Sequence, residues 1–298
     1  MKWISGETNN EGWEASDNDA NAGKGYYGAC CVEMDIWEAN SMATAYTPHP
    51  CDTVGAYRCE GTECGDNWTD ERYDGICDKD GCDFNSWRLG DQTFFGPGGD
   101  YAVDTSKPMT VVTQFVTSDG TDNGDLVEIR RVYVQDGQVI ENSFSNLDGD
   151  YNIIKSAAFN LFFPGIDTTD SITQDFCDQT KDIFGDIDDH AEKGGLKAMG
   201  ESLDRGQVLV LSMWDDHDAG MLWLDGNYPL DKDPSTPGVN RGPCPEDSGD
   251  PVDMEENYPD ATVKFYNVKF GPIGSTYPSG EKNSLGCQKH NWEHKHAN

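Results

Sequence analysis

The segments TVVTQFVT at 110–117 and LVEIRRVYV at 126–134 indicate the fold class of this chain of 298 residues. Both are rich in Val, Ile, Phe and Tyr and have the length of a β-strand. QVLVLSMW at 207–214 and ATVKFYNVKF at 261–270 have the same character. Long loops rich in Gly, Asp, Asn and Pro separate the four segments. We expect all four to form strands.

Helical patterns are confined to two connecting stretches, at about 171–184 and 189–203. Ser171 or Asp170 is positioned to cap the first of them. A chain in which strands dominate and helices only connect them predicts an all-β domain. We expect a β-sandwich rather than a βαβ fold.

The charge of the chain limits its partners. There are 55 Asp and Glu against 21 Lys and Arg, which gives a formal net charge of −34 at pH 7. Such a surface repels a phosphate backbone, so we expect no nucleic acid as a partner. A neutral polysaccharide is compatible with this charge. The longest apolar stretches, such as 208–214, are far shorter than the roughly 18 residues that a membrane span requires, so no membrane segment is expected.

Ten cysteines indicate an oxidising compartment, since disulfides rarely persist in the cytosol. We therefore expect a secreted protein, and the sequon Asn67-Trp68-Thr69 suits a glycosylated surface loop. The first residues, MKWISGETNN, lack the apolar region of a signal peptide, so a segment upstream is expected to be missing or removed.

Residues 47–100 form a strand-poor segment that holds five of the cysteines and needs cross-links to keep a shape. Zinc is the alternative use of clustered cysteines. The spacings here lack the paired C-x₂-C signature, which favours disulfides.

The chemical signal lies in EMDIWEAN at 33–40, where three acids alternate with large apolar groups. Glu33 and Asp35 share one face of a regular strand, and Glu38 would point to the other face. A β-bulge between Asp35 and Glu38 would return Glu38 to the common face. The outer acids would then stand about 13 Å apart along the backbone. Two Glu side chains leaning inward could approach the ~5–5.5 Å carboxyl separation of a retaining glycosidase. The same acids could also form an acidic surface strand or a calcium site, and spacing alone leaves these alternatives open.

A resemblance narrows the choice. CCVEMDIWEANS at 30–41, followed by TPHPC at 47–51, resembles the active-site strand of glycoside hydrolase family 7. The similarity continues in one order along most of the chain, in these segments: GWE at 12–14, ERYDGICDKDGCDFNSWRLG at 71–90, TQF at 113–115, KGGL at 193–196, SMWDDHDAGMLWLD at 212–225, STPGVNRGPC at 235–244 and FGPIGST at 270–276. The fold it implies is a concanavalin-like β-sandwich, a jelly roll with the glycan on its concave face.

The resemblance also implies catalytic roles. Glu33 corresponds to the nucleophile, Glu38 to the general acid and then base, and Asp35 to the residue that orients Glu33. A negative neighbour raises the pKa of a carboxyl group, which suits the group that must hold a proton. His49 matches a position beside the catalytic centre, although a lone His is more often structural.

Further residues match positions that bind sugar. Trp214 and Trp223 match stacking platforms, Trp214 on the substrate side and Trp223 near the leaving group. From the sequence alone either Trp is more often a core residue. The other matching residues, of which Arg72 and Arg241 would grip product hydroxyls, are Arg72, Asp80, Arg88, Asp215, Tyr228 and Arg241.

The resemblance implies three disulfides, Cys51–Cys77, Cys59–Cys64 and Cys82–Cys177. It places the partners of Cys30, Cys31 and Cys244 upstream of Met1, so we expect a chain truncated at its N-terminus, with doubtful activity alone. The chain retains the whole segment between Cys51 and Cys82. In endoglucanases of the family most of this segment is absent. This favours a reducing-end cellobiohydrolase.

We therefore expect residues 1–280 to be the C-terminal majority of one catalytic domain and 281–298 to be a disordered tail. Residues 148–165 exceed the family's connection in length. The expected activity is retaining hydrolysis of β-1,4-glucosidic bonds by a monomer, with cellulose or another β-1,4-glucan as partner, no cofactor and no metal. The alternatives are an endo-acting glucanase of the same family, a lectin-like glycan binder on the same scaffold and a calcium-binding acidic protein.

Overall fold

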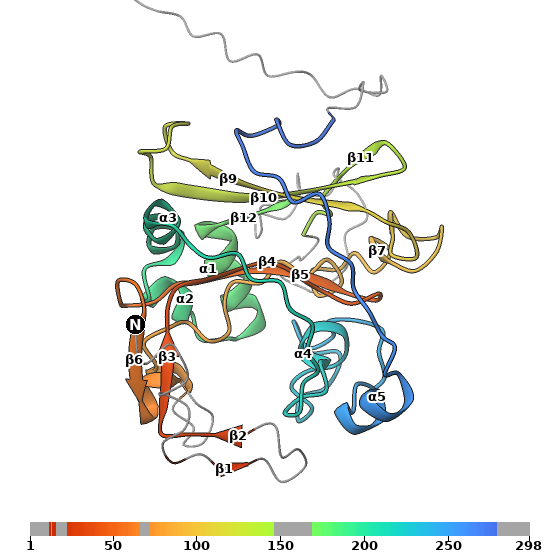
Figure 1. Ribbon diagram of the computed structural model, residues 1–298, viewed down its shortest axis with the longest axis horizontal. Helices are drawn as coiled ribbons and strands as arrows, with labels where there is room; N and C mark the ends of the chain where they lie inside the picture. The colour runs from red at the N-terminus through yellow and green to blue at the C-terminus, as the bar shows by residue number, and fades with distance from the viewer. Residues whose placement is uncertain (1–11, 13, 16–22, 66–71, 146–168, 279–298) are drawn as a thin grey trace, which may run out of the picture.

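The computed structural model describes residues 12, 14–15, 23–65, 72–145 and 169–278. Strands and extended loops make up most of this part of the chain (Figure 1). The strands are β1 (Glu14–Ala15), β2 (Gly23–Lys24), β3 (Tyr27–Cys30), β4 (Glu33–Ala39), β5 (Thr44–His49), β6 (Tyr57–Glu60), β7 (Phe95–Gly96), β8 (Val103–Asp104), β9 (Thr110–Thr117), β10 (Leu126–Gln135), β11 (Gln138–Glu141) and β12 (Ser171–Thr173). The helices are α1 (Gln174–Phe184), α2 (Asp189–Glu192), α3 (Gly195–Arg205), α4 (Leu222–Asp225) and α5 (Pro251–Asn257), with short 3₁₀ turns η2 (Gly61–Cys64) and η4 (Arg72–Asp74).

The largest sheet in the described part of the chain is built around β10. It has four strands, with β9, β11 and β12 all paired to β10 in antiparallel register. The strands predicted at 110–117 and 126–134 are confirmed as β9 and β10. Alternate side chains of β10, including Ile129 and Tyr133, are buried on the face that points into the protein.

A second layer is the antiparallel pair β4–β5, which lies beneath the β10 sheet (Figure 1). Nearly every side chain of β5 is buried. Helix α3 contacts both β10 and β5, so it closes one end of the space between the layers. The main core fills that space, where the ring of Phe84 stacks between Tyr46 and Phe176 at centroid distances of 5.4 and 5.3 Å. Aromatic stacking of this kind fixes how the two layers approach each other.

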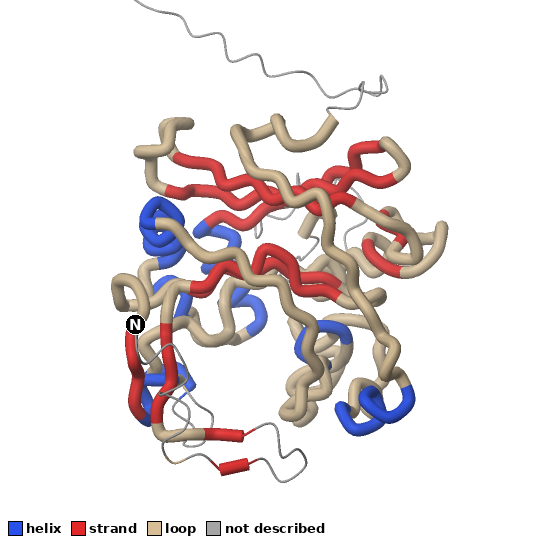
Figure 2. Tube along the Cα trace, in the orientation of Figure 1, coloured by secondary structure: helices blue, strands red, loops and turns tan. Residues whose placement is uncertain are grey.

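Two of the predicted strands are wrong. Residues 207–214 and 261–270 are extended but form no strand, and Figure 2 draws both as loops. Their side chains are largely exposed, as with Val208 at 88% and Phe270 at 99%. Apolar, β-branched residues favour an extended backbone, but a strand also needs a neighbouring edge to accept its hydrogen bonds. Within the described ranges these segments have no such ladder.

The first predicted helix starts later than expected, and the second is divided. Ser171 belongs to β12, where it pairs with Arg130, and Thr173 is the true cap of α1, because its Oγ1 accepts a hydrogen bond from the Phe176 amide at 3.1 Å. The single helix predicted over 189–203 is two helices, because Gly194, which lies between them, and Gly195, the first residue of α3, adopt positive φ values of 94° and 58°. None of the described helices is long and apolar enough to cross a membrane.

Three disulfides cross-link the described residues, and they are the pairs that the resemblance implied: Cys51–Cys77, Cys59–Cys64 and Cys82–Cys177. Cys30, Cys31 and Cys244 are thiols. Four features discussed from the sequence lie outside the described residues, namely the sequon at Asn67, Trp13 of GWE, the 148–165 segment and the 281–298 tail.

Candidate active site

The three acids of β4 are arranged by a bulge. Asp35 pairs with Thr47 and Glu38 pairs with Ala45, so three steps along β4 oppose two steps along β5. Ile36 and Trp37 therefore face the single residue Tyr46. The predicted bulge is present, and it returns Glu38 to the face that carries Glu33 and Asp35.

Glu38 is in an environment that favours its protonated form. Burial raises its pKa, the charge of Asp35 raises it further, and the result is a pKa of about 7. The hydroxyl of Thr47 lies 3.4 Å from Oε2 of Glu38 and opposes this shift slightly. A carboxyl group with such a pKa can hold a proton at neutral pH and release it to a leaving group.

The pKa of Glu33 is raised by the same two causes, burial first and then the charge of Asp35, while His49 lowers it. Glu33 pairs directly with His49 across the β4–β5 ladder. The strands therefore place His49 beside Glu33.

His49 is held from both sides. Its Nε2 lies 3.0 Å from Oδ2 of Asp35, and its Nδ1 lies 2.9 Å from the carbonyl oxygen of Asp78. A carbonyl and a carboxylate both accept, so this geometry asks each ring nitrogen to donate, which is the charged imidazolium. Burial opposes the charge, yet the hydrogen bond and charge of Asp35, with the charge of Asp78, raise the pKa of His49 to about 9.

The loop that follows Cys77 fixes His49 in place. Oδ1 of Asp78 accepts hydrogen bonds from the Asp80 and Gly81 amides at 3.2 and 2.9 Å. Gly81 has a φ of +69°, and a Cβ atom there would collide with Thr47 and His49. Only glycine allows this close approach of the loop to β5.

Arg72 and Asp80 lie in one polar cluster. Nε and Nη2 of Arg72 lie 2.7 and 2.5 Å from Oδ1 of Asp80, and the Tyr73 hydroxyl donates to Oδ2 at 2.9 Å. Burial opposes the charge of Asp80, but Arg72 and Lys181 outweigh it, so its pKa is lowered. The pair is about 30% exposed and can still present donors and acceptors to a ligand.

Trp214 and Trp223 lie next to each other. Their rings stack with centroids 6.1 Å apart and an interplanar angle of 17°. Trp214 is 55% exposed. Nε1 of Trp223 donates to Oδ2 of Asp216 at 3.1 Å, and Asp216 also accepts from the Asp218 and Ala219 amides. The two rings form one aromatic surface.

Arg241 and Tyr228 also lie together. The Arg241 guanidinium carbon is 5.9 Å from the centre of the Tyr228 ring, and Nη1 donates to the Trp223 carbonyl at 3.3 Å. Burial lowers the pKa of Arg241 to about 10, which leaves it charged at neutral pH. Its Nε is buried without a hydrogen-bond partner within the described residues.

Arg88 lies in a buried ion-pair cluster. Its side chain is 5% exposed, and its Nε donates to the Gly238 carbonyl at 2.9 Å. Nη1 contacts Asp83 at 2.5 Å and Nη2 contacts Asp186 at 3.0 Å. The guanidinium also covers the Phe184 ring at 4.0 Å. Each of the three guanidinium nitrogens of Arg88 thus has a partner within this cluster.

Asp215 belongs to a group whose composition could hold a metal ion. Its carboxyl oxygen and the ligand atoms of His217 and Glu255 lie within 4.8 Å of one another. One imidazole and two carboxylates suit several divalent ions. The resemblance assigned Asp215 to sugar binding instead. The imidazole two positions after Asp215 is visible in the sequence, but the contribution of Glu255 depends on how the chain folds.

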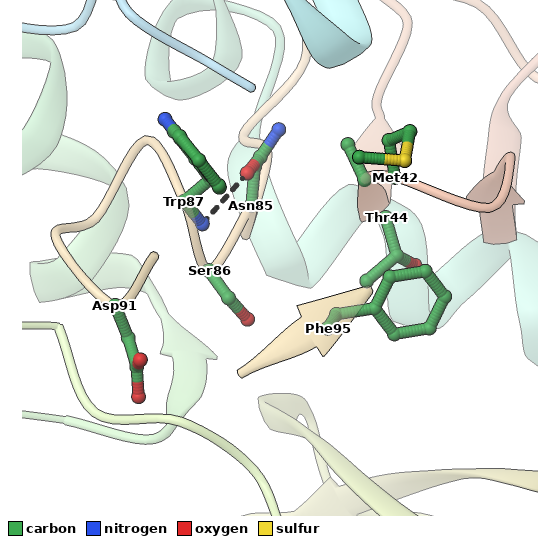
Figure 3. Close-up of a pocket in the computed structure, with 8 residues that line it drawn as sticks. Met42, Thr44, Asn85, Ser86, Trp87, Asp91 and Phe95 are labelled. Atoms are coloured by element: carbon green, nitrogen blue, oxygen red, sulfur yellow. Dashed lines mark hydrogen bonds between the residues drawn. The ribbon is translucent and has the colours of Figure 1, made fainter. Parts of the chain in front are cut away.

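The pocket drawn in Figure 3 is separate from these acids. Met42, Thr44, Asn85, Trp87 and Phe95 are among its lining residues, and none of the predicted site residues lines it. Its cavity volume is about 10 Å³. Ligand pockets usually start at about 300 Å³, so this hollow is too small for a glycan.

Sequence reasoning missed three polar residues of the site. Thr47 and Asp78 support Glu38 and His49, and Asp216 orients Trp223. Thr47 and Asp78 stand inside the quoted motifs TPHPC and CDKDGCD, so the signal was available. Their roles depend on which loop packs against β5, and the sequence does not specify that contact.

The profile of Glycosyl hydrolase family 7 matches residues 1–277. The chain belongs to glycosyl hydrolase family 7. A family 7 cellobiohydrolase from Daphnia pulex is 55% identical with a TM-score of 0.82, over 89% of this chain and 57% of that one.

Two other family 7 structures are similar. A cellobiohydrolase from Melanocarpus albomyces in complex with cellotetraose is 39% identical, with a TM-score of 0.75 over 89% of this chain and 55% of that one. The Humicola insolens endocellulase EGI is 36% identical, with a TM-score of 0.59 over 78% and 48%. The chain thus spans little more than half the length of the two cellobiohydrolases.

Proposed function

We propose that this family 7 protein hydrolyses β-1,4-glucosidic bonds in cellulose with retention of configuration and releases cellobiose from chain ends. The observation that carries the proposal is the bulged strand β4, which presents Glu33, Asp35 and Glu38 on one face. The pKa of about 7 at Glu38 supports its part as the acid.

In the first step Glu38 gives its proton to the glycosidic oxygen while the Glu33 carboxylate attacks the anomeric carbon. The cellobiose leaving group departs and a glycosyl ester forms on Glu33. Glu38 is then ionised, so it takes a proton from water, and this water releases the second product and frees Glu33. Water is the only co-substrate of the reaction.

Asp35 and His49 act on the acids rather than on the sugar. The His49 cation lowers the pKa of Glu33, which favours the ionised nucleophile. Asp35 raises the pKa of Glu38, which favours the protonated acid. Asp35 also raises the pKa of Glu33 and His49 also lowers that of Glu38, so the pair tunes both acids together. The pKa of about 7 at Glu38 comes first from burial.

Sugar recognition is assigned to residues around this centre. Trp214 and Trp223 offer an aromatic surface for the apolar face of a glucose ring. Arg72, Asp80, Tyr228 and Arg241 offer hydrogen-bonding groups. Asp215 remains an assignment from the motif match.

The cross-linked segment from Cys51 to Cys82 supports the cellobiohydrolase type. Disulfides Cys51–Cys77 and Cys59–Cys64 hold it, and the loop at 78–81 ties it to the β4–β5 pair through His49. A loop fixed beside the acids suits a roof over a threaded glycan. The similar Melanocarpus enzyme, crystallised with cellotetraose, is itself a cellobiohydrolase.

The same proposal covers the fold and setting of the protein. We assign residues 1–280 to one catalytic domain of the concanavalin-like β-sandwich class, with 281–298 as a tail. Disulfides suit an extracellular enzyme. We further propose that it is a monomer glycosylated at Asn67. Cellulose or a related β-1,4-glucan is the partner.

The test uses the full-length protein with Glu33→Gln and a matched control, Glu201→Gln, which makes the same change on an exposed helix position. We expect cellobiose release from crystalline cellulose by the wild type and the control, and none from Glu33→Gln. If the wild type binds cellulose without releasing sugar, the lectin-like alternative replaces the proposal.

An endo-acting glucanase is the second candidate, because the Humicola endocellulase also resembles this chain. The two candidate activities can be distinguished by their action on carboxymethylcellulose. Internal cutting lowers the viscosity of the solution before much reducing sugar appears, whereas release from chain ends yields cellobiose with little change in viscosity.

A further inference from the structure

Arg131 of β10 reaches the bulge from the opposite layer. Its Nη2 donates a hydrogen bond to the carbonyl oxygen of Ile36. Its guanidinium carbon lies 4.4 Å from the centre of the Tyr46 ring. Ile36 is one of the two bulge residues and Tyr46 is the residue that faces them, so Arg131 contacts both strands where the ladder is interrupted.

A bulge needs such a partner. The extra residue interrupts the ladder and leaves a backbone group without its usual partner on the neighbouring strand. A buried carbonyl without a hydrogen bond costs stability. The Ile36 carbonyl instead accepts from a cation, and hydrogen bonds to charged groups are stronger than neutral ones.

Arg131 itself is an unusual core residue. It is 2% exposed and lies between Ile129 and Tyr133 on the inward face of β10. Its Nε and Nη1 are buried without a hydrogen-bond partner among the described residues. Burying an arginine under these conditions is costly. In the described part of the chain, the contact of Nη2 with the bulge is the hydrogen bond that offsets this cost.

We infer that Arg131 is a positioning residue that fixes the bulge at Ile36 and Trp37 and so aims Glu38 at the glycosidic oxygen. The inference rests on the proposed function. Glu33 and Asp35 precede the bulge, so their face does not depend on it. Glu38 follows it. If the extra residue were accommodated further along the chain, Glu38 would turn to the opposite face.

This asymmetry predicts a specific defect. Loss of Arg131 should impair the acid and base steps of Glu38 and spare the attack by Glu33. A substrate with a poor leaving group, such as cellotetraose, needs the acid. 2,4-Dinitrophenyl β-cellobioside has a leaving group that departs without protonation, so formation of the glycosyl ester from it does not need Glu38.

The experiment compares the full-length wild type with Arg131→Met, Arg131→Lys and the control Arg130→Met, which alters the exposed neighbour. Since positioned proton transfer contributes about 10²–10⁴-fold, we expect Arg131→Met to lower kcat/KM for cellotetraose by about 100-fold. For the dinitrophenyl substrate we expect kcat/KM to stay within about threefold, since no proton transfer is lost there. Azide is a nucleophile that needs no general base, so it can replace water in the attack on the glycosyl ester. It should raise kcat of Arg131→Met on the dinitrophenyl substrate and not that of the wild type.

Equal losses on both substrates, without azide rescue, would overturn the inference and leave Arg131 as a core residue. Thermal unfolding checks that each variant is folded. If Arg131→Met is not, Arg131→Lys decides, because it keeps a cation of shorter reach. The loss in kcat/KM of Arg131→Lys must again be larger for cellotetraose than for the dinitrophenyl substrate. A wild type that is inactive on both substrates overturns the proposed function, and the role of Arg131 with it.

Discussion

Nε2 of His49 lies 3.0 Å from Oδ2 of Asp35, while Nδ1 of the same ring lies 2.9 Å from the Asp78 carbonyl. The first contact joins His49 to strand β4 and the second joins it to the disulfide-bonded loop. A charged imidazole therefore links the acids to the segment that is proposed to roof them.

His49→Gln should move both limbs of the pH–rate profile to higher pH. The His49 cation lowers the pKa of Glu33 and of Glu38, so its removal raises both. Since a neighbouring charge shifts a carboxyl pKa by one unit or more, we expect a displacement of about one pH unit. The measurement is kcat/KM for cellotetraose between about pH 4 and 9, a range that spans the ordinary carboxyl pKa and the raised one.

The control for this variant is His190→Gln. His190 is fully buried, and burial together with Lys181 and His49 lowers its pKa to about 3, so it is neutral across the same pH range. Its removal should lower stability and leave both limbs in place. Unshifted limbs in His49→Gln would refute the electrostatic role.

Glu38→Gln should stabilise the fold above neutral pH while it removes activity on cellotetraose. The folded-state pKa of Glu38, about 7, lies above its ordinary value of 4.5. Folding therefore favours the protonated form, and this contribution is lost as the pH rises from 4.5 through 7. A glutamine cannot ionise and avoids that loss. Melting temperatures measured at about pH 4 and about pH 8 should differ between variant and wild type more at the higher pH.

Arg88→Met should act on stability and not on sugar binding. Because it leaves Asp83 and Asp186 without their buried partner, we expect a loss of about 3–5 kcal/mol in the free energy of unfolding. Chemical denaturation measures this loss, and KM for cellotetraose should be unchanged at a temperature where the variant is folded. A raised KM with unaltered stability would return Arg88 to the sugar subsites.

The three disulfides should contribute unequally. Cys82–Cys177 spans 95 residues and links the end of the Cys51–Cys82 segment to α1, whereas Cys59–Cys64 spans 5 residues. From the entropy of loop closure, removing the first as a double alanine variant should cost about 4.7 kcal/mol and removing the second about 2 kcal/mol. Equal losses in melting temperature would contradict an origin in the unfolded state.

The sequence predicted the site better than it predicted the layers around it. Side chains alternate between the two faces of a strand, so Glu38 can share a face with Glu33 and Asp35 only if a bulge intervenes. This rule is local and can be applied to the sequence alone, and the bulge is present. Whether 207–214 and 261–270 are strands depends instead on a neighbouring edge elsewhere in the chain. The residues of these segments carry no information about that edge.

Arg88 and Arg131 illustrate the same limit. Arg88 stands in a segment that matches a family motif, and Arg131 stands in a predicted strand. The burial of both side chains depends on the residues that pack against them. In LVEIRRVYV the only hint was an arginine at an inward position of β10, between Ile129 and Tyr133. The resemblance assigned Arg88 to a sugar subsite, but Asp83 and Asp186 occupy its donors and Phe184 covers its face.

The extra residue that the bulge places between Asp35 and Glu38 affects how sequences of such strands should be aligned. Without Ile36, the strand would read E-x-D-x-E, its regular alternation would point all three acids the same way, and Glu38 could still pair with Ala45. The spacings E-x-D-x-x-E with a bulge and E-x-D-x-E without one are therefore geometric equivalents. Gapless alignment of such strands would register the last acid against the wrong residue, so searches for this constellation should allow one insertion before the final glutamate.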